Sequence, residues 1–265
     1  EIMISKSKDK NNNLIEFNPK GGRYRYKVNG MPKQGVTSLI GKRFSGGGLL
    51  WWAENCVYEA LKAKLHFENK PIDHTQQLID DLKARVKTIK EEAATIGTNL
   101  HKLAEDYING KEVVMPESEP LKTMFKKFKA YWKRSGFKVV ATEKTMYSEE
   151  LDVCGTSDLI VTKKAWNGKY GILDIKTSKD FYPDQVIQLH TYKKLCEDSL
   201  GYKIDYLAIL NVPKEPAKEV SLLAVKINPK YLKAFRACKY IFKIEEEFKK
   251  RMIEYNKQKG DKNAK

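Results

Sequence analysis

Three ionisable residues stand in two short segments whose other residues are typical of β-strands. Asp158 lies in 151-LDVCGTSDLIVTK-163, and Asp174 and Lys176 lie in 169-KYGILDIKTS-178. An Asn-Gly turn signal separates the segments, so they are predicted to form adjacent antiparallel strands that bring the two aspartates close together. Because an unpaired charge is costly to bury, these residues need partners.

Two neighbouring carboxylates repel each other, and a divalent cation between them removes the repulsion. Mg²⁺ and Mn²⁺ prefer oxygen ligands, and the backbone carbonyl of Ile175, between the acid and the lysine, is placed to add another oxygen. Alternate residues of a strand share a face, so Lys176 is predicted to point the same way as Asp174. It could then reach a metal-activated water or a phosphate, as phosphodiester hydrolysis requires. A single Asp-x-Lys triplet is more often a pair of ordinary solvated charges.

Two predicted helices supply further candidate residues. In 96-IGTNLHKLAED-106, His101 and Glu105 are four residues apart and therefore share a helical face. Imidazole can join a site whose other ligands are carboxylates, although a lone histidine is more often structural. Gln188 and Tyr192 are likewise one helical turn apart, directly after the second strand. A QxxxY spacing by itself is common by chance.

Taken together and in this order, the motifs resemble the RecB-like branch of the PD-(D/E)xK nuclease superfamily. The GTxxH helix motif of that branch is matched by 97-GTNLH-101, its strand aspartate by 155-GTSD-158, its D-x-K by 174-DIK-176, and its QxxxY by Gln188 and Tyr192. Ser157 replaces the proline that gives the superfamily its name, a change that this branch tolerates.

The front of the chain carries a second part of the resemblance. The segments 24-YRYKVNGMPKQGVTSLIGKRF-44 and 49-LLWWAENCVYEAL-61 are similar to the N-terminal region of phage exonucleases and of mitochondrial genome-maintenance exonucleases. The resemblance therefore extends from about residue 20 to about residue 230. It implies a metal-dependent deoxyribonuclease, an exonuclease that acts on single-stranded DNA or DNA ends in replication, recombination or repair. It also implies a setting such as a phage or another mobile genome.

The resemblance also implies roles for single residues. The metal ligands would be His101, Asp158, Asp174 and the carbonyl of Ile175, and the metal would be Mg²⁺ or Mn²⁺. Asp158, Asp174 and Lys176 would be catalytic, and Gln188 and Tyr192 would orient the site or the DNA backbone. Glu143, on the preceding strand, is open to two interpretations: an outer-sphere or second-metal acid, or an ordinary surface charge.

Cysteine usage separates this chain from some relatives, which hold an iron–sulfur cluster with one upstream cysteine and three grouped near the C-terminus. Cys56, Cys154, Cys196 and Cys238 are scattered, and Cys154 lies in a predicted strand. The sequence therefore predicts no iron–sulfur cluster, and it indicates neither a disulfide framework nor a structural zinc site.

The charge balance favours DNA as the partner. Lys and Arg outnumber Asp and Glu by 50 to 34, which gives a net charge of +16 and is typical of a phosphate-backbone binder, although solubility alone is an alternative. Candidate DNA contacts are Lys42, Arg43, Trp51, Trp52 and Lys179. The adjacent tryptophans could stack on bases or pack in the core.

No segment approaches the ~20 apolar residues of a membrane span, and the first residues are too polar for a signal peptide. The sequence therefore predicts a soluble, cytoplasmic protein without a membrane partner. It does not indicate an oligomeric state.

The expected fold is α/β: a restriction-endonuclease-like core with a central mixed β-sheet flanked by helices, and a helical N-terminal region. We expect a single nuclease domain over residues 1–265. Its predicted parts are a polar segment (1–20), a hairpin plus helices (21–136), the catalytic sheet (137–228), a C-terminal helix (229–255) and a disordered basic tail (256–265). The alternatives that stay open are a structure-specific endonuclease on the same scaffold and a catalytically silent DNA-binding module.

Overall fold

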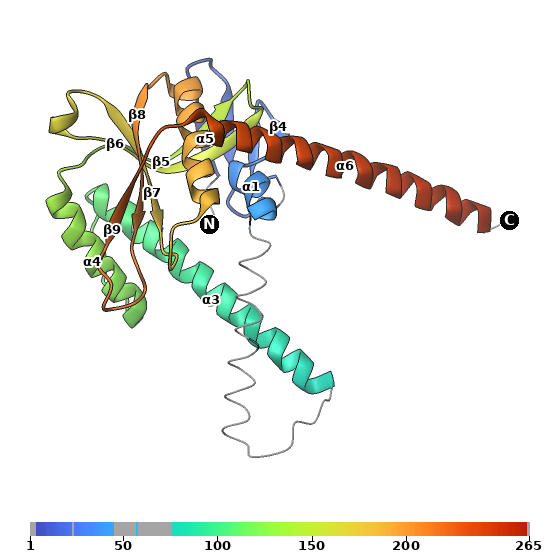
Figure 1. The fold of residues 1–265 in the computed structure, drawn as a ribbon, viewed down its shortest axis with the longest axis horizontal. Helices are drawn as coiled ribbons and strands as arrows, with labels where there is room; N and C mark the ends of the chain where they lie inside the picture. Colours follow the sequence, from blue (N-terminus) through green and yellow to red (C-terminus); the bar gives the residue numbers. More distant parts are fainter. Residues whose placement is uncertain (1–3, 23, 45–56, 58–75, 264–265) are drawn as a thin grey trace.

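The computed structural model describes residues 4–22, 24–44, 57 and 76–263. A five-stranded sheet in the order β5-β6-β7-β8-β9 forms its centre (Figure 1). The strands are β5 (Lys138–Ser148), β6 (Val153–Thr162), β7 (Tyr170–Lys176), β8 (Ile204–Asn211) and β9 (Ser221–Val225). Strands β7 and β8 are parallel and the other neighbours are antiparallel, so the sheet is mixed, as predicted. The parallel pair needs a crossover, which α5 (Pro183–Leu200) provides.

Helices cover both faces of this sheet, because its strands are apolar on both sides. On one face, α3 (Gln76–Ile108) and α4 (Glu119–Ser135) pack on side chains such as Leu159 and Leu173. On the other, α1 (Val36–Phe44), α5 and α6 (Pro229–Asn263) pack on side chains such as Ile160 and Ile172. This arrangement confirms the predicted α/β class and is consistent with a restriction-endonuclease-like core.

A second, smaller sheet precedes α1. Its antiparallel strands are β1 (Ser5–Lys8), β2 (Leu14–Phe17), β3 (Tyr26–Val28) and β4 (Met31–Lys33). The hairpin of β3 and β4 was predicted from the Asn29-Gly30 turn, and both turn residues have positive φ, as a tight hairpin requires. Strands β1 and β2 lie within residues 1–20, for which the sequence predicts a polar segment without naming its elements. Their polar residues are compatible with a strand because Ile15 alone supplies the buried contact.

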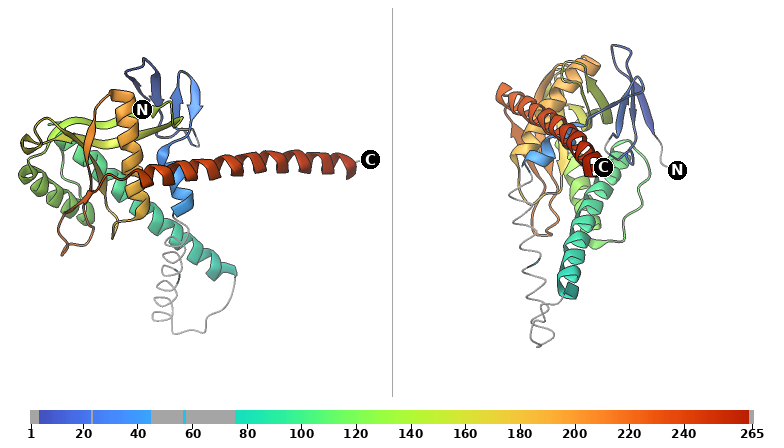
Figure 2. Two further views of the ribbon diagram at one scale, coloured as in Figure 1. Left: turned by 45° about the horizontal axis from the view of Figure 1, so that its top comes forward. Right: turned by 90° about the vertical axis from the view of Figure 1, so that its right-hand side faces the viewer.

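The C-terminal helix also differs from its predicted length. We expected disorder from residue 256, but α6 continues to Asn263 and projects from the body of the molecule (Figures 1 and 2). The expectation rested on the lack of apolar residues, which removes packing partners. It does not remove the intrinsic helical preference of Lys and Gln, and no proline interrupts the segment. Within the described residues, no helix is long and apolar enough to cross a membrane.

Candidate active site

Three acidic residues lie in one row across β5, β6 and β7. The β5–β6 register places Glu143 opposite Asp158. The β6–β7 ladder has Leu159 paired with Leu173 as its last pair on this side, and the next position of the same register brings Asp174 opposite Asp158. Directly opposite residues of antiparallel strands share a face, so the strand pairing itself gathers the three carboxylates. The backbone pairing of β6 and β7 ends at this position.

A histidine from α3 completes a group of possible metal ligands. His101 Nδ1 lies 3.4 Å from Asp158 Oδ1. One ligand atom from each of His101, Glu143 and Asp158 lies within 4.8 Å of the other two. Glu143 adopts a left-handed conformation with φ of 43°, and although the residue is solvent-accessible, its carboxylate is turned into this group. One imidazole nitrogen and two carboxylates form a donor set that suits a divalent cation.

The position of His101 follows from how α3 packs. Leu100 and Ala104 are fully buried against the sheet, and His101 therefore occupies the edge of that buried stripe. Gly97 lies one turn earlier on the helix and faces the end of β7, where an added Cβ would lie in ordinary contact with Thr177 Oγ1, at 3.4 Å. The glycine and the histidine of the GTxxH motif thus lie at the same contact between helix and sheet.

The predicted Asp-x-Lys pair lies beside this group. Asp174 is 1% exposed and forms an ion pair with Lys176, whose side chain is 22% exposed. Oδ2 is the oxygen that pairs with Lys176, whereas Oδ1 accepts no hydrogen bond within the described part of the chain. A buried polar atom is rarely left in this state, and an unsatisfied carboxylate oxygen next to a ligand group fits a site that a cation completes.

The backbone at Ile175 orients one of the ligands. Its N–H donates a hydrogen bond to Asp158 Oδ2 over 2.7 Å, so Oδ1 is left to face His101. This N–H contact positions Asp158. The role of the Ile175 carbonyl as a metal ligand stays a prediction.

The charges of the site shift one another's pKa values. Burial disfavours a charged imidazole, but the Asp158 carboxylate outweighs it and raises the pKa of His101 to about 9. Burial raises the pKa of Glu143 to about 8, with a further contribution from the charge of Asp158. Burial also raises the pKa of Asp174 to about 6, against the opposing charge of Lys176. Burial opposes the ionisation of Asp158 as well, but His101 brings its pKa below the usual range. Without a cation, His101 and Glu143 therefore hold protons at neutral pH.

Helix α5, which packs on β6 and β7, carries the predicted Gln188 and Tyr192, and the charges of Asp174 and Asp158 act on the Tyr192 hydroxyl. Gln188 Nε2 donates a hydrogen bond to Tyr192 Oη over 2.8 Å, and Tyr192 is buried. Its ring lies directly over Gly155, where an added Cβ would approach a ring carbon to 2.6 Å. The glycine of the GTSD motif thus provides the space for the tyrosine of QxxxY.

Tyr26 of the small sheet contacts β6 next to Gly155, a contact that the sequence did not predict. Tyr26 Oη lies 3.1 Å from Thr156 Oγ1, which in turn lies 3.1 Å from Thr145 Oγ1. Burial raises the pKa of Tyr26 to about 12, so its hydroxyl stays neutral. The alternation of tyrosines in the β3 segment showed a strand, but only the tertiary packing brings that strand to β6.

The predicted DNA contacts have different outcomes. The guanidinium of Arg43 donates to the Leu39 carbonyl and to Glu245, because α6 brings a carboxylate to α1. A DNA contact of Arg43 stays a prediction. Lys179 is exposed in the turn between β7 and α5. The Lys42 side chain, Trp51 and Trp52 lie outside the described residues.

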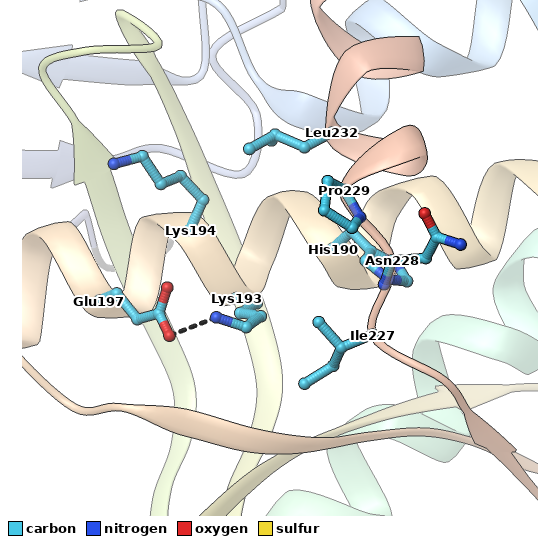
Figure 3. Close-up of a pocket in the computed structure, with 8 residues that line it drawn as sticks. All are labelled: His190, Lys193, Lys194, Glu197, Ile227, Asn228, Pro229 and Leu232. Carbon is cyan, nitrogen blue, oxygen red and sulfur yellow. Dashed lines mark hydrogen bonds and ion pairs between the residues drawn. The ribbon is translucent and has the colours of Figure 1, made fainter.

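A separate hollow lies between α5 and the start of α6, lined by His190, Lys193, Lys194, Glu197, Ile227, Asn228, Pro229 and Leu232 (Figure 3). His190 uses both ring nitrogens there. Nε2 accepts a hydrogen bond from the Asn228 N–H, which leaves Nδ1–H to donate to the Val186 carbonyl. This histidine is structural, and the hollow lies apart from the acidic row.

Comparisons with known proteins add little to this geometry. No family model matches the chain, and no curated protein matches it. Solved structures do match, among them a crystal structure from Eubacterium rectale named "Putative exonuclease", which is 14% identical with a TM-score of 0.35. The match covers 54% of this chain and 62% of that one, so it spans less than two thirds of the other protein.

Proposed function

We propose that this chain is a metal-dependent deoxyribonuclease of the PD-(D/E)xK superfamily, in its RecB-like branch. Its substrate would be single-stranded DNA or DNA ends, which it would cleave as an exonuclease in replication, recombination or repair. The observation that carries the proposal is the junction of His101, Glu143 and Asp158 with the buried Asp174–Lys176 pair. The candidate metal ligands, a buried carboxylate and a lysine meet there, where the pairing of β6 and β7 ends.

Each residue of the site has a task in this reaction. His101, Glu143 and Asp158 would hold Mg²⁺ or Mn²⁺, with Asp174 facing the same space. A bound divalent cation supplies charge neutralisation at the phosphate and lowers the pKa of a bound water. Lys176 adds a positive charge next to Asp174, which can position the attacking water or stabilise the charge that develops on the phosphate.

The surroundings keep these groups in place. The Ile175 N–H fixes the orientation of Asp158, and Gln188 fixes the hydroxyl of the buried Tyr192. Preorganised groups of this kind lower the barrier because they need not reorganise during the reaction. The excess of basic residues favours a polyanionic substrate over a small phosphodiester.

The test is digestion of end-labelled single-stranded and double-stranded DNA with Mg²⁺ or Mn²⁺. Wild type is compared with Asp174→Ala and with a control variant, Asp205→Ala. Asp205 lies in β8, and its one described ion pair is a 3.9 Å contact with Lys203. We expect cleavage by wild type and by the control, and a loss of at least about a thousandfold in Asp174→Ala. Absence of cleavage by wild type with either metal would favour the silent DNA-binding module.

Closed circular DNA separates the two nuclease modes. An exonuclease needs an end, so we expect linear single strands to be degraded and closed single-stranded circles to persist. If circles are cut as fast as linear strands, the exonuclease assignment is wrong and the endonuclease alternative holds. Neither result bears on the proposed metal site. Asp174→Ala tests whether that site cleaves DNA, and closed circles test whether cleavage needs an end.

A further inference from the structure

The projecting part of α6 carries an apolar stripe. Five large side chains, between 39% and 62% exposed, follow one another at intervals of 3, 4, 4 and 3 residues: Ile241, Ile244, Phe248, Met252 and Tyr255. At about 100° per residue, this spacing keeps all five within about 40° of the direction of Phe248. A soluble helix that extends from the body with such a stripe calls for a covering partner (Figures 1 and 2).

The charges around the centre of the stripe are self-complementary. Phe248 is preceded by Glu245, Glu246 and Glu247 and followed by Lys249, Lys250 and Arg251. A twofold axis at Phe248 reverses the direction of the second helix, so on one flank of the stripe it places Glu247 of each copy beside Arg251 of the other. Glu246 and Lys250 lie about 160° round the helix from Phe248 and face away from this contact. A parallel pair would instead set acid beside acid and base beside base.

We propose that α6 forms an antiparallel helix pair with a second copy of this chain, with the twofold axis at Phe248. Phe248 would then meet the partner's Phe248, Ile241 the partner's Tyr255, and Ile244 the partner's Met252. On one flank, Glu247 lies within about one helical turn of the partner's Arg251, and the symmetric contact repeats it. The 3-4-4-3 spacing suits two nearly straight helices, since it follows an 11-residue repeat.

The described part of the protein leaves the five side chains of the stripe 39% to 62% exposed. The start of α6 packs on the body, where Glu245 binds Arg43, and Phe242 lies under the guanidinium at 5.5 Å. Phe242 points about 120° away from Phe248 round the helix, whereas Glu245, about 60° away, lies at the border of the stripe. Five half-exposed side chains on each copy would bury on the order of 1,000 Å² in total, which lies near the lower bound of specific interfaces. We therefore expect a dimer of micromolar affinity.

The first experiment is the mass of the purified chain by analytical ultracentrifugation from about 1 to 100 µM, the range in which such an interface would dissociate. Wild type should pass from monomer to dimer. Phe248→Asp should weaken dimerisation at least about a hundredfold. Ile253→Asp is the matched control, because Ile253 is 57% exposed on the same helix but lies about 140° away from Phe248. Circular dichroism checks that each variant keeps its helices.

A charge exchange tests the orientation. Glu247→Lys and Arg251→Glu each replace two attractive contacts by two repulsive ones, so each alone should raise the dimer Kd about tenfold. An equimolar mixture restores both contacts in a mixed dimer, which should recover the wild-type affinity.

Four results would overturn the proposal. A monomer throughout the concentration range excludes the pair, and a dimer that survives Phe248→Asp has its interface elsewhere. A Phe248→Asp variant that unfolds more easily without a change of mass would mean that the same chain covers the stripe. Variants of Glu247 and Arg251 that fail to complement each other in the mixture would exclude the antiparallel arrangement.

Discussion

Replacing Asp174 by asparagine should stabilise the metal-free protein while it removes activity. Asp174 is 1% exposed, and burial raises its pKa from the ordinary 3.8 to about 6 even though Lys176 lies next to it. At about 1.4 kcal/mol per pKa unit, ionising this carboxylate in the folded state costs about 3 kcal/mol relative to the unfolded chain. Asparagine resembles the neutral acid in shape, so it avoids that cost.

The pH dependence follows from the direction of the shift. A pKa that is higher in the folded than in the unfolded state destabilises the protein as the pH rises, and the full cost is present above about 6. We therefore expect the free energy of unfolding of Asp174→Asn to exceed that of wild type by about 3 kcal/mol at pH 8, and by about half as much at pH 5. The measurement is urea denaturation in EDTA at both pH values.

Adding Mn²⁺ should narrow or reverse the difference in unfolding free energy between Asp174→Asn and wild type. Only wild type keeps the full set of carboxylates that can bind the ion. Binding at a hundredfold excess over Kd stabilises a protein by about 2.7 kcal/mol. Asp205→Asn, remote from the site, should differ from wild type by at most about 0.5 kcal/mol under every condition. If Asp174→Asn is less stable than wild type at pH 8 in EDTA, the ion pair with Lys176 outweighs the cost of burial, and the reasoning is refuted.

Three further predictions concern other parts of the site and its support. Glu143→Gln should lower the affinity for Mn²⁺ at least about tenfold in an electron paramagnetic resonance titration, and an unchanged affinity would return Glu143 to a surface role. Gly155→Ala should cost about 2 kcal/mol of unfolding free energy, since its Cβ would meet the Tyr192 ring at 2.6 Å; a neutral effect would show that the ring moves freely. Burial lowers the pKa of His190, so protonating this residue at low pH destabilises the fold. The unfolding free energy of wild type should therefore fall relative to that of His190→Gln as the pH drops below 6.5, and parallel plots of unfolding free energy against pH would contradict this.

The main elements of the core were readable from the sequence because their signals are local. The Asn-Gly turns, the C-cap at Gly136 and the apolar runs of the sheet each determine structure within a few residues, and the observed strands and helices follow them closely. The sequence was less informative where packing and local preference point in different directions. The strand around Ile15 needs the neighbouring sheet, and the end of α6, for which we expected disorder, is helical.

The site shows the same division. Asp158, Asp174 and Lys176 were candidates because charges in strands are unusual, and His101 because its motif came in the right order. The interpretation of Glu143 stayed open, since an acid on an edge strand has no distinguishing mark in the sequence. Only the β5–β6 register, a long-range property, places it opposite Asp158 and within reach of His101.

What the sequence determined by itself is therefore the chemistry available to this protein: carboxylates, an imidazole and a lysine on a mixed α/β scaffold with a strongly basic surface. What only the tertiary structure decided is which of these groups meet. Strand register aligned the acids, the packing of α3 turned His101 toward them, and the packing of α6 on α1 paired Arg43 with Glu245. The physical reason is that residue types and local spacing fix what a side chain can do, whereas distances between remote segments depend on how the whole core packs.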